Sequence, residues 1–384
     1  MAITRREFGQ GLGAGALAMG AGVPAFAQGP YRGPNIVIVR FGGGVRRAET
    51  IEPATTYAPF LANVLARRGV LFADMRIDAL RGTDTSHAEG TLNILTGRYG
   101  AYHKVGSQGL APLLEPTAPT LFEQLRATFA LAAHEVLLVN GEDRPQEEYL
   151  TYGGHGHYGV AFRSEVIGLY RFKLHKLARV LAEARLPDKE LKAAADELAK
   201  LRSRDYRGTA QSDDPVLTAF WDRWRAHYGD SGLKNPRGDR LLTELALRAL
   251  RELRPRLMMV NYQDPDYVHW GNATHYTRAI AIIDQGLERI IAAIDADETY
   301  RGRTVIVVVP DCGRDANPLM AVPYQHHFNS RSAHEIFALF VGPGISAGRR
   351  IAAAVDQTSI AATVAALAGF KSEAEGRVLS EVMT

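Results

Sequence analysis

Runs of consecutive apolar residues, many of them β-branched, recur along the chain and set its predicted framework. An apolar run without polar alternation is typical of a strand that is buried on both faces, as in a parallel sheet. The predicted strands are residues 35–39, 70–73, 136–139, 257–260, 305–309 and 336–341.

Segments with Ile, Leu or Ala at helical spacing lie between these runs. Gly69, Gly97 and Gly369 closely follow three of them, and glycine is a common stop signal for a helix. Strands that alternate with helices predict an α/β fold, in which a mainly parallel sheet is sandwiched by helices. The predicted helices are residues 57–68, 91–96, 121–128, 276–294 and 357–367.

The stretch from residue 161 to residue 255 departs from this alternation. It is almost entirely helical in pattern and mixes Arg and Lys with Asp and Glu throughout. We expect a helical insertion in the α/β domain, with a solvated amphipathic face. The other interpretation is a cap that gates the access of a substrate.

The first 27 residues have the pattern of a secretory signal peptide. Arg5-Arg6 precedes a short, glycine-rich apolar run, and Ala25-Phe26-Ala27 supplies a small-residue cleavage site. The paired arginines resemble the signal that the twin-arginine (Tat) export machinery reads. We therefore predict a signal peptide at 1–27, an α/β domain at 28–384, and a periplasmic or secreted protein. The apolar run is too short to span a bilayer and no later segment reads as a span, so we expect none in the mature form.

Composition excludes several classes of function. Of the 384 residues, 46% are hydrophobic and 23% are charged, which is ordinary for a folded protein with a large core. The formal net charge is only +3 and gives no support for nucleic-acid binding, which a basic stripe or patch would indicate. The single cysteine, Cys312, excludes an internal disulfide framework and a multi-cysteine metal site.

Three groups of potential metal ligands lie near the ends of predicted strands. The first follows strand 257–260, the second follows strand 305–309, and the third lies in the loop before strand 336–341. Ligands bind at the carboxyl edge of an open α/β sheet, and Asp with His favours a divalent ion such as zinc. The alternative is that these carboxylates cap helices and the histidines lie at the surface. The candidate ligands are Asp264, Asp266, His269, Asp311, Cys312, His326 and His327.

A segment rich in hydroxyl groups precedes the predicted helix at 91–96. Thr85, Ser86 and His87 place two hydroxyls beside an imidazole near the start of a helix, where a nucleophile and an anionic substrate could be held. The alternative is N-capping, for which Ser and Thr are favoured residues.

Gly42-Gly43-Gly44 follows the first predicted strand. A glycine-rich turn at this place is a feature of dinucleotide-binding folds, but the pattern G-x-G-x-x-G is absent. We therefore expect no nucleotide cofactor.

Several motifs, in order along the chain, resemble those of the alkaline phosphatase / sulfatase superfamily. The resemblance implies an α/β fold and hydrolysis of small anionic phosphate or sulfate esters by two metal ions beside a Ser, Thr or modified Cys nucleophile. The matching segments are 35–39, 57–72, Leu95-Thr96-Gly97-Arg98-Tyr99 with His103 ("L-T-G-R-Y…H"), Asp266–His269 with Tyr276 and Asp284 ("D…H…Y…D"), Asp311-Cys312-Gly313 ("D-H-G") and 341–348 ("v-G-P-G-I-x-x-G").

The chain also departs from the pattern of that family. Gly43 or Gly44 stands where the family has an aspartate after the first strand, and Cys312 stands for the histidine of "D-H-G". Counting back from Gly97 puts the nucleophile position on His87, with Ser86 and Thr85 beside it. We therefore expect one divalent ion, zinc, rather than two.

Two hypotheses follow from the sequence. The first is an exported, metal-dependent hydrolase of phosphate or sulfate esters with an altered metal site, in which Thr85, Ser86 or a water molecule attacks. The second is a non-catalytic binding or assembly protein on a degenerate alkaline-phosphatase-like scaffold, without metal. In the first hypothesis one metal is held by Asp264 or Asp266, His269, and His326 or His327, while Asp311 and Cys312 contribute to another site.

We expect replacement of both Arg5 and Arg6 by Lys to leave the precursor in the cytoplasm, because the Tat signal depends on the paired arginines. Cell fractionation measures the distribution of the protein. Normal export of this double variant would contradict the Tat interpretation.

Overall fold

The computed structural model describes residues 29–383 apart from residues 79–82, 109–110, 154–157, 208–213, 236, 270, 318–323 and 327–329. The strands in this part are β1 (Asn35–Phe41), β2 (Gly69–Arg76), β3 (Tyr102–Gln108), β4 (Ala111–Pro116), β5 (Val136–Val139), β6 (Glu165–Ile167), β7 (Leu257–Tyr262), β8 (Thr304–Val309), β9 (Glu335–Val341), β10 (Arg349–Ile351) and β11 (Val355–Asp356). The α-helices are α1 (Arg47–Thr50), α2 (His87–Thr96), α3 (Leu121–Phe129), α4 (Leu169–Glu183), α5 (Asp188–Arg202), α6 (Pro215–Tyr228), α7 (Asp239–Glu252), α8 (Ala273–Ala296) and α9 (Ser359–Leu367).

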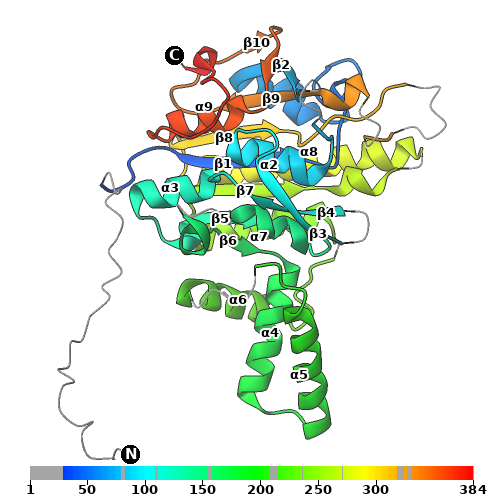
Figure 1. The fold of residues 1–384 in the computed structure, drawn as a ribbon, viewed down its shortest axis with the longest axis vertical. Coiled ribbons are helices and arrows are strands. Elements are labelled where there is room, and N and C mark those ends of the chain that lie inside the picture. Colours follow the sequence, from blue (N-terminus) through cyan, green and yellow to red (C-terminus); the bar gives the residue numbers. More distant parts are fainter. Residues whose placement is uncertain are drawn as a thin grey trace, which may run out of the picture.

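A large sheet forms the centre of the molecule (Figure 1). Its strands run in the order β10-β2-β9-β8-β1-β7-β5-β6, and β11 also pairs with β2. β1 lies between β8 and β7 and is parallel to both, and the parallel arrangement continues through β5 to β6. β9 runs antiparallel to β2 and β8. The prediction of a mainly parallel sheet is confirmed.

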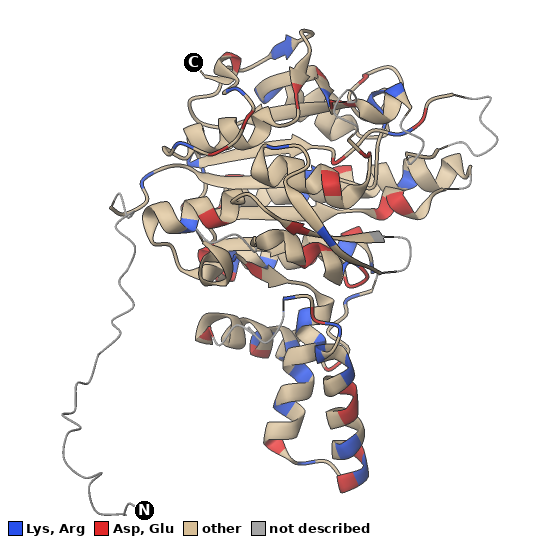
Figure 2. Cartoon of the chain, viewed as in Figure 1, with Lys and Arg blue, Asp and Glu red and all other residues tan. Residues whose placement is uncertain are grey.

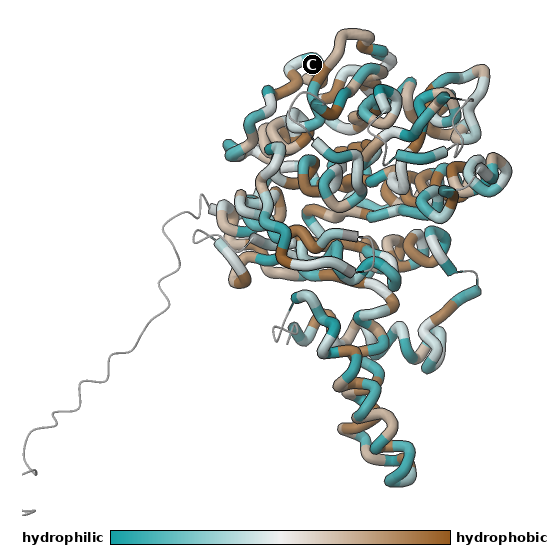
Figure 3. The backbone as a smooth tube through the Cα atoms, turned by 45° about the vertical axis from the view of Figure 1, so that its right-hand side comes forward, coloured by the Kyte–Doolittle hydropathy of each residue, from teal (hydrophilic) through white to brown (hydrophobic). Residues whose placement is uncertain are grey.

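Both faces of the sheet are buried, as the unbroken apolar strands require. In β1, Val37 and Val39 point into a core that includes α7 and α8, whereas Ile36 and Ile38 point into a second core that includes α2, α3 and α9. Apolar segments accordingly concentrate in the sheet and in the helices that flank it (Figure 3). The result is the predicted sandwich of helices around a sheet.

The predicted helix at 57–68 is less regular than its pattern suggests. A π-helical turn, η1 (Phe60–Val64), is followed by a 3₁₀ turn, η2 (Leu65–Arg68). β2 begins directly at Gly69, and tight 3₁₀ turns are common where a helix must end abruptly.

The carboxylate of Asp284, on α8, holds the start of η1. Its two oxygens accept hydrogen bonds from the N–H groups of Phe60 at 2.9 Å and Leu61 at 2.8 Å. Burial raises the pKa of Asp284 to about 6, although these N–H groups oppose the rise. Tyr276, also on α8, accepts a hydrogen bond from the backbone of Arg46 at 2.9 Å. The Tyr276 and Asp284 side chains thus bind α8 to the segment between β1 and β2.

The stretch from 161 to 255 is more varied than its composition suggests. β6 joins the edge of the sheet beside β5, and α6 and α7 contribute to a core of the α/β domain. α4 and α5 form a hairpin that projects beyond the β6 edge of the sheet (Figure 1). Charges of both signs cover this hairpin (Figure 2), as expected of a solvated amphipathic face.

Ion pairs anchor the base of the projecting hairpin. Arg171 of α4 donates to Glu148 at 2.7 Å and to both oxygens of Asp205 at 2.7 Å. Burial opposes the charge of Arg171, but these two carboxylates raise its pKa overall. Glu148 lies on the 3₁₀ helix η5 (Pro145–Thr151), which also carries Glu147 of the site described below.

The predicted signal peptide, residues 1–27, lies outside the described residues. Within the described part of the chain, no helix is both long enough and apolar enough to cross a bilayer.

We expect Asp284→Ala to lower the free energy of unfolding by about 1–2 kcal/mol, because two N–H groups lose their acceptor. Urea unfolding at pH 8, where Asp284 is ionised, measures the loss. Glu288→Ala is the matched control, because Glu288 is an exposed carboxylate one turn further along α8. Equal stability of the two variants would contradict the capping role.

Candidate metal centre

The loops after β1, β7 and β8 meet at one edge of the sheet, because these neighbouring strands run in parallel. The loop after β1 supplies Gly43 and Gly44, the loop after β7 supplies Asp266, and the loop after β8 supplies Asp311. α2 begins at His87 and brings this imidazole to the same edge, between the two aspartates.

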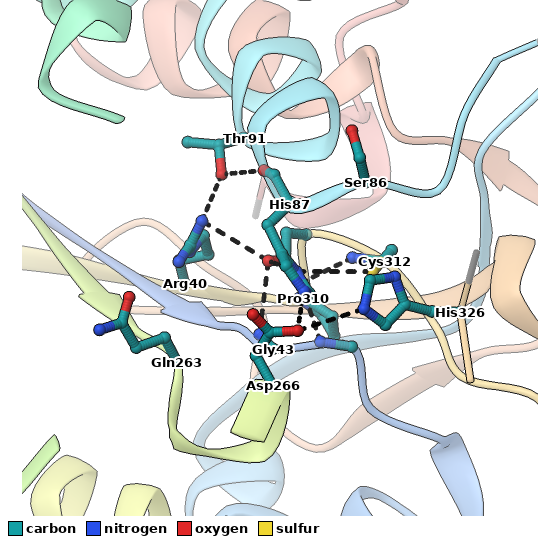
Figure 4. A network of polar contacts seen from close by, with 12 residues as sticks. Arg40, Gly43, Ser86, His87, Thr91, Gln263, Asp266, Pro310, Cys312 and His326 are labelled. Carbon is teal, nitrogen blue, oxygen red and sulfur yellow. Dashed lines mark hydrogen bonds and ion pairs between the residues drawn. The ribbon is translucent and has the colours of Figure 1, made fainter. Parts of the chain in front are cut away.

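One oxygen of Asp266 is the meeting point of three imidazoles. Asp266 Oδ1 lies 2.5 Å from His87 Nε2, 2.9 Å from His269 Nε2 and 3.2 Å from His326 Nε2. Figure 4 shows His87 and His326 turned toward Asp266, and the centroids of these two rings are 4.3 Å apart. The four side chains form a compact cluster.

The other nitrogen of each of these rings, Nδ1, faces a hydrogen-bond acceptor. Nε2 of each ring faces the Asp266 oxygen, so both nitrogens of each ring lie opposite an acceptor. A neutral imidazole carries a single N–H, so one nitrogen of each neutral ring meets its acceptor with a lone pair. The acceptors opposite Nδ1 are Asp311 Oδ2 for His87 at 2.8 Å, the carbonyl of Thr85 for His326 at 2.9 Å and the amide oxygen of Gln325 for His269 at 3.2 Å.

This convergence of acceptor atoms calls for a cation. Three imidazole nitrogens and a carboxylate oxygen are ligands that zinc prefers, and acceptors behind the histidines are typical of metal sites. The ligand atoms of His87, Asp266 and His326 lie within 4.8 Å of one another. Burial lowers the pKa of His269, which favours the neutral ring that a metal requires. The residues therefore fit one divalent ion.

Asp311 is a fully buried carboxylate beside this cluster. Its Oδ1 accepts from the N–H groups of Cys312 at 2.8 Å and Gly44 at 3.3 Å. Its Oδ2 accepts from His87 Nδ1 at 2.8 Å and from the N–H of Gly43 at 3.4 Å. Burial would raise the pKa of Asp311, but the charges of His87 and Arg40 lower this pKa below its usual range. Asp311 is therefore ionised.

Cys312 is fully buried next to Asp311. Its Sγ lies 3.9 Å from His87 Nδ1, and together with Asp311 these residues form a second group of closely spaced potential ligands. Burial and the charge of Asp311 raise the pKa of the Cys312 thiol, which favours the neutral S–H.

Three charged residues of the site were not predicted from the sequence: Arg40, Arg144 and Glu147. Arg144 forms an ion pair with Asp266 Oδ2 and lies 3.8 Å from Glu147 Oε1. Arg40 lies 3.2 Å from Glu147 Oε2 and 3.5 Å from Asp311 Oδ2. The imidazole of His87 lies between the two aspartates and completes a closed ring of six side chains, which we call the charge ring.

The sequence does contain signals for two of these residues. Arg40 is a lone charge within the buried strand β1, and an unpaired charge is costly there. Arg144 follows the end of β5, at the same sheet edge as the predicted ligands. Glu147 carries no comparable signal.

In the described structure, the hydroxyls of Thr85 and Ser86 form hydrogen bonds with backbone groups rather than with Asp266. Thr85 Oγ1 donates to the backbone carbonyl of His326. Ser86 Oγ caps α2 by accepting a hydrogen bond from the N–H of Glu89 at 3.3 Å, and Figure 4 shows it turned away from the cluster. Of the three predicted catalytic residues, His87 is the one that contacts Asp266.

Asp264 also lies apart from the cluster. Its Oδ1 accepts from the N–H of Asp239 at 3.1 Å, and the carboxylate of Asp239 accepts in return from the N–H of Asp264 at 2.8 Å. This exchange ties the loop after β7 to the start of α7. His327 lies outside the described residues, and His103 is exposed on β3.

Arg314 holds the loops of the site together. This guanidinium is fully buried and bonds only to backbone carbonyls in the described structure. The acceptors come from the loop after β1, the loop after β7 and the segment before β9. They are the carbonyls of Gly43, Gly44, Pro265, Val268 and Tyr324.

No protein-family profile and no curated protein sequence matches this chain. Solved structures do match: a Vibrio parahaemolyticus protein in the alkaline phosphatase superfamily aligns over 92% of this chain and 71% of its own, with 13% identity and a TM-score of 0.53. The chain has an alkaline-phosphatase-like fold. The alkaline phosphatase PafA aligns over 91% of this chain and 99% of its own, with 13% identity and a TM-score of 0.53. A 2-O GAG sulfatase aligns over 91% and 73%, with 11% identity and a TM-score of 0.53.

The alkaline-phosphatase-like fold confirms what the sequence motifs imply about architecture. At 11–13% identity the likeness extends to the fold, so activity must be argued from the side chains at the sheet edge.

We expect the mature protein to bind one zinc ion and His269→Ala to bind far less, because loss of one ligand disrupts the geometry of the cluster. Elemental analysis after dialysis against zinc measures the content. His275→Ala is the control, since His275 is exposed near the start of α8 and lies outside the cluster. Unchanged zinc in His269→Ala would overturn the ligand assignment.

Proposed function

We propose that the protein is an exported, metal-dependent hydrolase of phosphate or sulfate esters. One divalent ion, zinc, is held by Asp266, His269 and His326. The observation that carries the proposal is the convergence of the Nε2 atoms of His269 and His326 on Asp266 Oδ1, with Nε2 of His87 beside them. The alkaline-phosphatase-like fold supports the substrate class, because the similar structures include an alkaline phosphatase and a sulfatase.

The charge of the site suits an anionic ester. In the charge ring, the carboxylates of Glu147, Asp266 and Asp311 face the guanidinium groups of Arg40 and Arg144, which leaves one negative charge. A divalent ion reverses that sign, and the ion polarises the ester and stabilises the charge that develops on its oxygens. The N-terminus of α2 favours an anion at the same edge of the sheet.

His87 is the residue that we propose to act on the attacking water. Its Nδ1–H donates to the buried carboxylate of Asp311, which fixes the orientation of the ring and leaves Nε2 as the basic atom. Nε2 takes a proton from water, the water oxygen bonds to phosphorus or sulfur, and the bond to the ester oxygen breaks. Burial disfavours the charged imidazole, but Asp311 raises the pKa of His87 overall, which stabilises the imidazolium that this step forms.

Export through the Tat pathway to the periplasm or the exterior completes the proposal. It rests on Arg5-Arg6 and Ala25-Phe26-Ala27. The burial of Cys312 is consistent with this location, because an accessible lone thiol would be open to oxidation there.

The second candidate function is a non-catalytic binding protein on the same scaffold. The observation that favours it is that the hydroxyls of Thr85 and Ser86, the two predicted nucleophiles, bond to backbone groups instead of Asp266. Purified mature protein that is folded, free of metal and inactive would support this second function.

We expect slow but measurable hydrolysis of an aryl phosphate or an aryl sulfate by the zinc-loaded protein, and loss of that activity with a chelator. We expect His87→Ala to lower kcat by roughly 10²–10⁴-fold, since a positioned base contributes about that much. Ser86→Ala is the matched control: it removes a helix cap and costs stability, yet leaves turnover largely intact.

Two results would change these assignments. Full activity of His87→Ala would exclude His87 as the base. Inactive but folded Ser86→Ala would instead make Ser86 the nucleophile.

A further inference from the structure

The residues around Asp311 do not fit the second metal ion that the motif resemblance implies. The aspartate expected after the first strand is replaced by glycine, and the backbone leaves no room for it. Gly43 and Gly44 have φ of +83° and +70°, where a side chain is strained. A Cβ on Gly43 would lie 2.5 Å from the backbone N of Asp266, and one on Gly44 would lie 2.9 Å from the carbonyl of Gly313.

The same glycines turn their N–H groups to Asp311. Gly43 and Gly44 donate to its two oxygens at 3.4 Å and 3.3 Å, and the N–H of Cys312 and Nδ1 of His87 donate at 2.8 Å each. A carboxylate offers about four lone-pair sites. These four donors therefore occupy the positions through which Asp311 would coordinate an ion.

Arg40 supplies the positive charge that Asp311 needs. Arg40 is fully buried and precedes Gly43 on the same strand–loop segment, with Nη1 3.5 Å from Asp311 Oδ2. Thr91 Oγ1 accepts from Nη1 at 2.6 Å, which fixes the guanidinium beneath the start of α2 (Figure 4). A Cβ on Gly42 would lie 2.8 Å from Arg40 Nε, so the first glycine makes room for this side chain.

We propose that the Arg40 guanidinium and the N–H groups of Gly43 and Gly44 replace the second metal ion, so that the protein holds a single divalent ion at Asp266. A guanidinium stays charged at any physiological pH, and its charge does not depend on the supply of metal. Cys312 then needs no ligand role and packs as a small buried residue. The inference deepens the proposed function, from which it takes the Asp266 cluster as the site of the one ion.

The first test is the number of ions bound. Native mass spectrometry of the mature protein, after dialysis against excess zinc and separately against excess magnesium with zinc present, counts the ions per chain. We expect one. Two ions per chain would overturn the inference and leave the proposed function standing. No bound ion would overturn the proposed function together with the single ion at Asp266, and the second test would then decide whether Arg40 balances Asp311.

The second test is a double-mutant cycle on thermal stability. We expect Arg40→Met to lower Tm by roughly 5 °C or more, because it leaves Asp311 buried without its cation. In the Asp311→Asn background the same change should lower Tm by less, since Arg40 then balances the carboxylate of Glu147 alone. Additive losses in Tm would overturn the inference.

Arg47→Met is the matched control for the cycle. Arg47 pairs with Asp74 and Glu335, away from Asp311, so its effect on Tm should be the same with and without Asp311→Asn. Arg40→Met alone could fail to fold. In that case a folded Arg40→Met/Asp311→Asn protein supports the inference. A double variant that also fails to fold, together with two bound ions in the parent protein, overturns it.

Discussion

The parallel pairing of β1 with both β7 and β8 is the constraint on which the rest of the site depends. The register places Arg40 opposite Asn261 on one side and Val309 on the other, so the three strands end at nearly the same level. Their loops must therefore emerge together. Residues more than 200 positions apart in the chain, such as Gly43 and Asp311, become hydrogen-bonding neighbours for this reason.

This constraint also explains which parts of the fold and of the candidate site could be predicted from the sequence. Unbroken apolar runs such as Ile36–Val39 identify buried parallel strands, and strand ends identify the edge where ligands gather, so the fold and the general location of the site could be predicted. The choice between Asp264 and Asp266 could not, because both follow the same strand. Asp264 faces the start of α7 and Asp266 faces the histidines, and only the path of the loop separates them.

The residues that sequence reasoning missed belong to long-range pairs. Arg40 pairs with Glu147 and with Asp311. Glu147 lies on the 3₁₀ helix after β5, and Asp311 lies in the loop after β8. No local pattern encodes such a meeting. A buried ion pair contributes little net stability by itself, because desolvation offsets most of the attraction. The main effect of the charge ring is to fix the positions of the side chains at this edge of the sheet.

Arg314 makes the site an all-or-none assembly. A single guanidinium donates to carbonyl groups of three separate loops, so displacement of Arg314 removes hydrogen bonds from all three at once. An opening that displaces this side chain is then a cooperative event of local unfolding rather than the fraying of one loop. A partly opened edge, in which some of these carbonyl groups are left without their donor, is thereby disfavoured.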